Sequence, residues 1–257
     1  MGFRYLDKIA TAVHVQQFLE LADLALGAGH SADNVFPLYH RLGTSWPMQL
    51  CRKRLARDPA CQALIDQRRF CGPYDSERLL AMPRGSLGHT YATALQAMGY
   101  DINFFPDPSF FNNLEDDADY INYRVYVTHD IHHIVSGFSL DNFGELGVIS
   151  ISVAQLSHPG LAFTDLIALL MSWLHTDTPI DVLESPAEQA RTTAYSLRMI
   201  SQGLEMGVAA QPLFPVIWEE RFEQNLEELR TELGITPVSE GAWSLAETPA
   251  IRQALVV

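Results

Sequence analysis

Residues 128–155 read THDIHHIVSGFSLDNFGELGVISISVAQ, and side chains that commonly bind metals lie in this stretch between two apolar, periodic segments. On an α-helix each residue advances about 100°, so His129 and His133 lie one turn apart and roughly 40° apart around the axis. Asp130 lies only about 60° beyond His133. The spacing therefore predicts a helix with three ligand-type side chains on one face.

A second helix is expected after this one, and it carries an acidic group. Gly137 and residues 139–142 have the residue types that end one helix, form a turn and cap the next. Glu145 follows His133 by twelve residues and would lie on the second helix. The sequence thus predicts two helices joined by a short turn, with Glu145 free to face the histidine pair.

Two histidines and two carboxylates form a set that suits a divalent metal. Nitrogen and oxygen ligands together fit zinc, iron or manganese, and magnesium is a further candidate; we expect zinc first. The predicted ligands, and through the metal the predicted catalytic residues, are His129, Asp130, His133 and Glu145. In the alternative reading, His129 and Asp130 are ordinary surface groups and His133 is a core histidine. A zincin-type protease is disfavoured because Asp130 stands where HExxH has its general-base glutamate.

Three further residues are secondary candidates, for supporting the metal ligands or contacting a bound molecule. His132 lies on the opposite side of His129 from His133, so it is a supporting donor, a proton shuttle or a surface group rather than a ligand. Ser136 is small enough to let a helix or a ligand approach closely, and Tyr91 belongs to the apolar face of an earlier predicted helix. The remaining histidines that we considered, His89, His158 and His175, each stand alone and are expected to be ordinary packing or surface residues.

Composition bounds the class of protein. The chain has 257 residues, of which 47% are hydrophobic and 19% charged, which is typical of a globular protein with a large core. We expect a single helical domain over 1–257. The net charge of −14 disfavours a nucleic-acid binder. Cys51, Cys61 and Cys71 fit no zinc or disulfide spacing and are expected to be free thiols.

Helical periodicity dominates the chain, and we find no internal repeat, GxGxxG, P-loop, GxSxG or long alternating pattern. The expected class is all-α: a multi-helix bundle. An irregular loop is expected at 104–113, acidic residues 115–119 should begin a helix, and the tail 239–257 has no chemistry that we can name. Outside the central pair, helices are expected at 3–28, 35–43, 46–55, 60–69, 86–99, 161–175, from Ser185-Pro186 to about 209, and 215–233.

Location can be predicted only coarsely. Residues 1–8 already hold Arg4, Asp7 and Lys8, unlike a secretory signal, and the apolar run 161–174 is too short to span a membrane. We expect an intracellular protein, cytoplasmic or peripheral to a membrane. Six of the seventeen basic residues lie between 52 and 69; such a cluster is usually a solvated face, and contact with anionic lipid or phosphate is the alternative.

The arrangement of these residues resembles a known family. His129-Asp130-x-x-His133, eleven further residues and Glu145 look like the HDxxH-x11-E signature of the ubiquinone (coenzyme Q) biosynthesis protein 4 family. Agreement continues in chain order at Arg84 to Gly88 with Tyr91, at Asp116 to Tyr120, at Trp218 to Glu220, at Leu226 to Arg230 and at Leu233 to Ile235. The resemblance covers roughly residues 75–235. It departs at His132, where the family more often has an apolar or aromatic residue, and in the Arg-rich part before residue 70.

The resemblance implies an all-helical protein that binds a divalent metal beside a cavity for a polyprenylated ring. The implied activity is replacement of the ring C1 carboxylate by a hydroxyl, and the implied partners are a prenylated quinone precursor, other quinone-pathway enzymes and a peripheral membrane surface. A non-enzymatic isoprenoid-binding scaffold is the first alternative, and a metal-dependent prenyl-phosphate hydrolase is the second. A homodimer is one assembly that the sequence leaves open.

Overall fold

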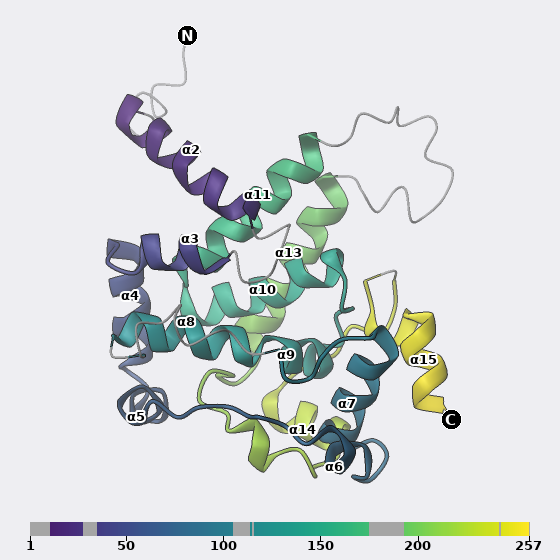
Figure 1. The fold of residues 1–257 in the computed structure, drawn as a ribbon. Coiled ribbons are helices and arrows are strands. Elements are labelled where there is room, and N and C mark those ends of the chain that lie inside the picture. Colours follow the sequence, from purple (N-terminus) through teal and green to yellow (C-terminus); the bar gives the residue numbers. More distant parts are fainter. Residues whose placement is uncertain are drawn as a thin grey trace, which may run out of the picture.

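Helices make up the regular structure of the protein in the computed structural model, which describes residues 11–27, 35–104, 114, 116–174, 193–241 and 243–256 (Figure 1). No strand occurs in these residues, and the extended pairing consists of two isolated bridges, Ser86 with Asn225 and Phe138 with Ser244. The all-α prediction is confirmed. The α-helices are α2 (Ala12–Gly27), α3 (Val35–Leu42), α4 (Trp46–Leu55), α5 (Pro59–Gln67), α6 (Ser76–Leu80), α7 (Leu87–Met98), α8 (Asp117–Val127), α9 (His129–Ser136), α10 (Asn142–Leu156), α11 (Pro159–Leu174), α13 (Thr193–Ala209), α14 (Leu226–Leu233) and α15 (Pro249–Val256). Two short 3₁₀ helices are η4 (Trp218–Glu220) and η5 (Leu245–Glu247).

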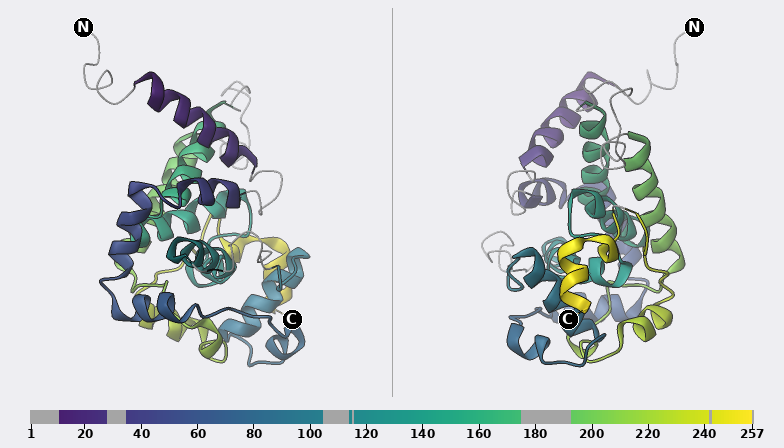
Figure 2. Two further views of the ribbon diagram at one scale, coloured as in Figure 1. Left: turned by 60° about the vertical axis from the view of Figure 1, so that its left-hand side comes forward. Right: turned by 90° about the vertical axis from the view of Figure 1, so that its right-hand side faces the viewer.

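Helices α10 and α13 pack tightly side by side near the middle of the molecule, with α11 against both (Figures 1 and 2). The two helices can approach closely because Gly203 of α13 has no side chain. A Cβ atom at Gly203 of α13 would lie 2.2 Å from the carbonyl oxygen of Gly147 on α10 and 2.7 Å from Cβ of Ser150. No larger residue fits at that crossing unless the helices move apart, so α10, which carries Glu145, packs directly against α13.

Helix boundaries follow the capping signals of the sequence. Ser86 accepts a hydrogen bond from the His89 amide at the start of α7, and Gly99 ends that helix with φ of 73°. Asp58 caps α5 through the Ala60 amide. Helix α5 ends at Gln67, two residues before the predicted end. The local residue types therefore decided where these helices begin and, for α7, where it ends.

The prediction of one helix over 215–233 is wrong. The segment folds as η4, a turn and then α14, whose start is capped by the Asn225 side chain. The break occurs because the carbonyl oxygens of Phe222 and Gln224 accept hydrogen bonds from Gly88 and Leu87, at the start of α7. The hydrogen bonds to α7 are thus favoured over the hydrogen bonds of a continuous helix. The five periodic apolar residues are nevertheless all buried: Trp218, Phe222, Leu226, Leu229 and Leu233.

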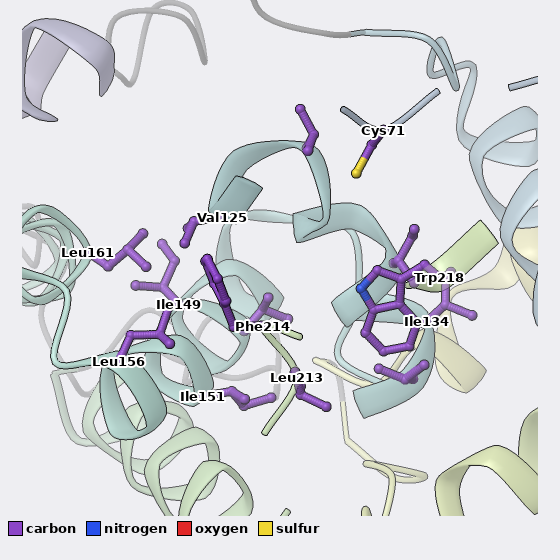
Figure 3. Packing of buried hydrophobic residues seen from close by; sticks show 14 of the residues in the cluster. Cys71, Val125, Ile134, Ile149, Ile151, Leu156, Leu161, Leu213, Phe214 and Trp218 are labelled. Atoms are coloured by element: carbon purple, nitrogen blue, oxygen red, sulfur yellow. The ribbon is translucent and has the colours of Figure 1, made fainter. Parts of the chain in front are cut away.

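One continuous hydrophobic core joins these helices (Figure 3). Trp218 is 1% exposed and packs close to Ile134 of α9, while Ile149 and Leu156 of α10 face Val125 of α8 and Leu161 of α11 (Figure 3). The segment that carries the predicted ligands is therefore surrounded by apolar side chains. The three cysteines are free, as expected, and all three are buried.

Internal contacts use much of the basic cluster at 52–69. Arg52 and Arg68 both bind the Asp117 carboxylate at 2.6 Å, and Arg54 donates to the Ala154 carbonyl and the Ser157 hydroxyl. Asp117 therefore lies at the start of α8 and also pairs with two arginines of the basic cluster. Only part of the cluster, with Lys53 and Arg57, is left as a solvated face.

Some predictions fall on residues outside the described part of the chain. These are the start of the first helix (residues 3–10), nearly all of the loop 104–113, the Ser185-Pro186 helix start and His175. The described part of the first helix is Ala12–Gly27, and its predicted end at residue 28 also lies outside the described residues.

Candidate metal centre

The two predicted helices and the turn between them are present. Helix α9 runs from His129 to Ser136 and is followed by Gly137, whose φ of 76° is a left-handed conformation that suits glycine. Asp141 then caps α10 by accepting hydrogen bonds from the amides of Phe143 and Gly144. Gly137 therefore follows the end of α9 and Asp141 caps α10, as the residue types predicted.

A distant segment fixes this turn. Val238 donates its amide to the Ser136 carbonyl, Leu245 donates to Gly137, and the Trp243 carbonyl accepts from Ser139. The backbone groups left unpaired at the end of α9 are thereby satisfied. The relative position of α9 and α10 thus depends on the chain around residues 238–245.

Three ligand-type side chains converge between α9 and α10. The Nε2 atoms of His129 and His133 are 3.1 Å apart, and the Glu145 carboxylate lies 2.7 Å from the first and 3.3 Å from the second. One ligand atom of each residue lies within 4.8 Å of the other two. His133 is fully buried, whereas the side chains of His129 and Glu145 are 20% and 41% exposed, so the group opens on the Glu145 side.

The donor set fits a divalent metal. With Zn–N bonds of about 2.0–2.1 Å, two ligand atoms of a tetrahedral site lie roughly 3.3 Å apart, which is close to the spacing of the three donor atoms. The Nδ1 atom of His133 faces the Phe138 carbonyl at 3.4 Å, and a proton there leaves the Nε2 lone pair directed at the other two residues. His129, His133 and Glu145 therefore form a group that could hold a metal ion.

Electrostatics couple the three groups. Burial lowers the pKa of His129, but the charge and hydrogen bond of Glu145, together with Asp130, outweigh it and raise that pKa to about 9. Burial raises the pKa of Glu145, yet the two histidines hold it well below its usual value. The carboxylate is therefore ionised, as a metal ligand must be.

Asp130, the fourth predicted ligand, is not part of this three-residue group. It lies near enough to raise the pKa of His129 and, after burial, that of Tyr91. Tyr91 is 2% exposed and stacks on Phe222. Asp130 therefore acts on the site electrostatically, and its role as a direct ligand stays a prediction.

His132 is buried and lies outside the three-residue group, so the surface alternative for it is wrong. Its ring packs edge-on against Trp218 at 5.6 Å, and neither ring nitrogen has a hydrogen-bond partner in the described chain. Burial, with the positive charge of nearby groups, lowers its pKa to about 3. The ring is therefore neutral and packs in the core, and its role as a supporting donor or proton shuttle stays a prediction. Ser136 is buried, and its hydroxyl donates to the His133 carbonyl at 3.4 Å.

Sequence reasoning missed two groups that depend on long-range contacts. Arg230 of α14 donates to the carbonyl oxygens of Ile134 and Val135 at the C-terminal end of α9. Ser150 of α10 donates to Asp165 of α11 at 2.8 Å inside the core. No local spacing around Arg230 indicates its contacts with α9. The contact between Ser150 and Asp165 is indicated only by the presence of a carboxylate, Asp165, within the apolar run 161–174.

The fold and the His-His-Glu group on α9 and α10 define the class of this chain. It is an all-helical protein with a candidate metal centre between two of its helices. The chain belongs to the family described as coenzyme Q (ubiquinone) biosynthesis protein Coq4, whose sequence profile matches residues 8–239. The match extends through the Arg-rich segment, which the sequence alone had left unmatched.

Similar proteins agree with this family. The ubiquinone biosynthesis protein COQ4, mitochondrial, of Clavispora lusitaniae is 26% identical over 86% of this chain and 66% of its own length. The protein of the same name from Eremothecium gossypii is 29% identical over 63% of this chain and 45% of its own. This chain thus spans about half to two thirds of these relatives.

A solved structure shares the fold. The crystal structure of a putative ubiquinone biosynthesis protein from Nostoc punctiforme superimposes with a TM-score of 0.68 and 25% identity, over 85% of this chain and 97% of the other. The all-helical architecture is therefore common to both proteins.

Proposed function

We propose that this protein acts in ubiquinone biosynthesis by binding a polyprenylated ring at a divalent metal and replacing the ring C1 carboxylate with a hydroxyl. One observation carries the proposal: ligand atoms of His129, His133 and Glu145 lie within 4.8 Å of one another in a chain of the Coq4 family. Zinc is our first expectation for the metal, and iron, manganese and magnesium are the others.

In this proposal His129, His133 and Glu145 hold the metal, and Asp130 completes the set or orients His129. When bound, a divalent cation supplies Lewis acidity to the carboxylate or neighbouring phenol oxygen of the ring. His133 is buried and its Nδ1 lies beside the Phe138 carbonyl, so its ring keeps one orientation. The half-exposed Glu145 side leaves room for the polar head of the substrate.

The apolar helices around the site would bind the prenyl tail. Burial of each CH₂ contributes about 0.8 kcal/mol, so a few isoprene units supply much of the binding energy. The polar residues then need only orient the ring.

The reaction balances with dioxygen as oxidant and water as the source of the hydroxyl. The bond from ring carbon to carboxyl carbon breaks and CO₂ leaves, a ring carbon–oxygen bond forms, and dioxygen takes two electrons and two protons to leave as hydrogen peroxide. Water and dioxygen both come from solution. The partners in the proposal are other quinone-pathway enzymes at a membrane surface; in the described residues no helix is long and apolar enough to cross one.

Carboxyl-labelled prenyl-4-hydroxybenzoate tests the proposal through the release of labelled CO₂. Wild-type protein reconstituted with zinc, iron or manganese should release label, and His133→Ala and Glu145→Ala should release none while still binding the prenylated ring. Glu223→Gln, an exposed acid away from the group, is the matched control and should keep full activity.

Two other outcomes would assign a different function. Wild-type protein that binds the ring but releases no CO₂ with any of these metals would contradict catalysis and favour an isoprenoid-binding scaffold. Release of inorganic phosphate from a prenyl phosphate, lost in the same variants, would favour the hydrolase.

A further inference from the structure

A cavity lies between α7, α14 and α15, and none of the three candidate metal-binding residues lines it. Its volume is about 510 Å³, within the size range of small-molecule sites. Figure 1 shows α15 beside α7 at one end of the molecule, and Figure 2 shows the same pair from another side. Apolar side chains form much of the wall, among them Leu226, Val238, Leu245, Ile251 and Leu255.

Basic side chains line the same cavity. Arg84, Arg230 and Arg252 belong to its wall, as does His89, against a single acid, Glu227. Glu227 is already paired with Arg230, so it does not neutralise the others. In a chain of net charge −14, this is a local excess of positive charge over an apolar floor.

Arg84 differs from the next four residues of the chain, because each of those has a structural role. Gly85 takes φ of 80° and its carbonyl accepts from Leu226, Ser86 caps α7, and Leu87 is fully buried. A Cβ at Gly88 would meet Met82, Leu79 and Phe222 at 3.0 Å or less, so only glycine fits there. Arg84 alone has no such role: it is exposed and makes no side-chain hydrogen bond or ion pair with the described residues.

We propose that this cavity binds an amphiphile with a single anionic head, a carboxylate or a phosphate, which Arg84 pairs at the rim while the apolar chain lies on the floor. A guanidinium matches either head by paired hydrogen bonds. The ring of His89 offers a further polar contact, because its Nδ1 atom is buried and has no partner in the described chain. Arg252 adds positive charge, since its contact with Glu247 is long, at 3.5 Å, and solvent-exposed.

The site is separate from the metal centre but is connected to it. Arg230 faces the cavity and at the same time holds the carbonyl oxygens of Ile134 and Val135, at the end of the helix that carries His129 and His133. Binding at Arg84 does not require the metal, and the proposal is therefore independent of the proposed function.

Calorimetry with three probes of equal chain length tests the proposal: decanoate, decyl phosphate and the uncharged decanol, all below micelle formation. The wild-type protein should bind both acids about tenfold more tightly than decanol, because a hydrogen bond to a charged group contributes about that much. Arg84→Gln should weaken both acids about tenfold and leave decanol unchanged. Ala246→Trp, at an exposed position on the cavity wall, should fill the space and weaken all three probes.

Two controls make the result specific. Arg57→Gln, at an exposed position in the turn between α4 and α5, and Glu145→Gln, in the metal centre, should bind all three probes as the wild type does. The proposal is overturned if the wild type binds neither acid, if Arg84→Gln weakens decanol as much as the acids, if Ala246→Trp binds as the wild type does, or if Glu145→Gln abolishes binding.

Discussion

The Nδ1 atom of His133 lies 3.4 Å from the carbonyl oxygen of Phe138, five residues further along the chain. A carbonyl only accepts hydrogen bonds, so a proton on Nδ1 would satisfy this contact and leave the Nε2 lone pair free for a metal. The turn after α9 thus offers an acceptor for the tautomer that coordination through Nε2 requires.

The tautomer can be observed directly. In metal-loaded protein, ¹⁵N NMR should show His133 protonated at Nδ1 and coordinated through Nε2. Without metal the Nδ1 proton should persist, because the Phe138 carbonyl does not depend on the ion. Coordination through Nδ1 would show that the turn does not orient this ring.

Asp130→Asn should show whether Asp130 contributes to metal binding. Asp130 lies outside the three-atom group but raises the pKa of His129. If it only orients or polarises His129, the variant should bind metal about 10-fold to 100-fold more weakly, the range for groups that support a ligand. Equilibrium dialysis measures the change, with Asp66→Asn on α5 as an exposed control. An unchanged affinity would exclude both roles.

Gly203→Ala should destabilise the fold. The new Cβ would lie 2.2 Å from the Gly147 carbonyl, so α13 must move away from α10. We expect a loss of about 2 kcal/mol or more in the free energy of unfolding, measured with urea. Val208→Ala, 79% exposed on the same helix, should change it by about 0.5 kcal/mol at most. A Gly203→Ala protein as stable as this control would mean that the helix crossing is not tight.

Asp165→Asn should remove a pH dependence of stability. Burial raises the pKa of Asp165 to about 7, against the partial opposition of the Ser150 hydrogen bond, from 3.8 in an exposed group. Because the folded pKa is the higher one, the folded chain binds the proton more tightly, and stability is lost as pH rises through 7. Between pH 5 and pH 8 the wild type should therefore lose roughly 2–3 kcal/mol relative to the variant.

The comparison with the variant isolates Asp165. His129 has a raised pKa as well and acts in the same direction, but it is present in both proteins and cancels in the difference. The measurement is urea unfolding at several pH values. Parallel curves for wild type and Asp165→Asn would show that Asp165 is ionised in the folded protein across this range.

Local spacing predicted what local structure decides. The period of 3.6 residues placed His129 and His133 on one face, and the glycine and aspartate signals placed the turn and the start of α10, hence Glu145 opposite them. The structure adds which donor atoms actually meet, and it leaves Asp130 outside that group.

Long-range contacts account for what was missed. The helix expected over 215–233 is broken because the carbonyl oxygens of Phe222 and Gln224 bind the start of α7, which no local pattern reveals. For the same reason the burial of His132 against Trp218 and the hold of Arg230 on α9 could not be read from spacing.

Metal content is the most direct test of the central claim, that His129, His133 and Glu145 hold a metal ion. Elemental analysis combined with native mass spectrometry should find one divalent ion per wild-type chain. Glu145→Gln should lose it while remaining folded by circular dichroism, because the substitution removes a charged ligand without changing the shape of the side chain. A wild-type chain that binds no divalent ion, or a Glu145→Gln chain that binds it equally tightly, would contradict the claim.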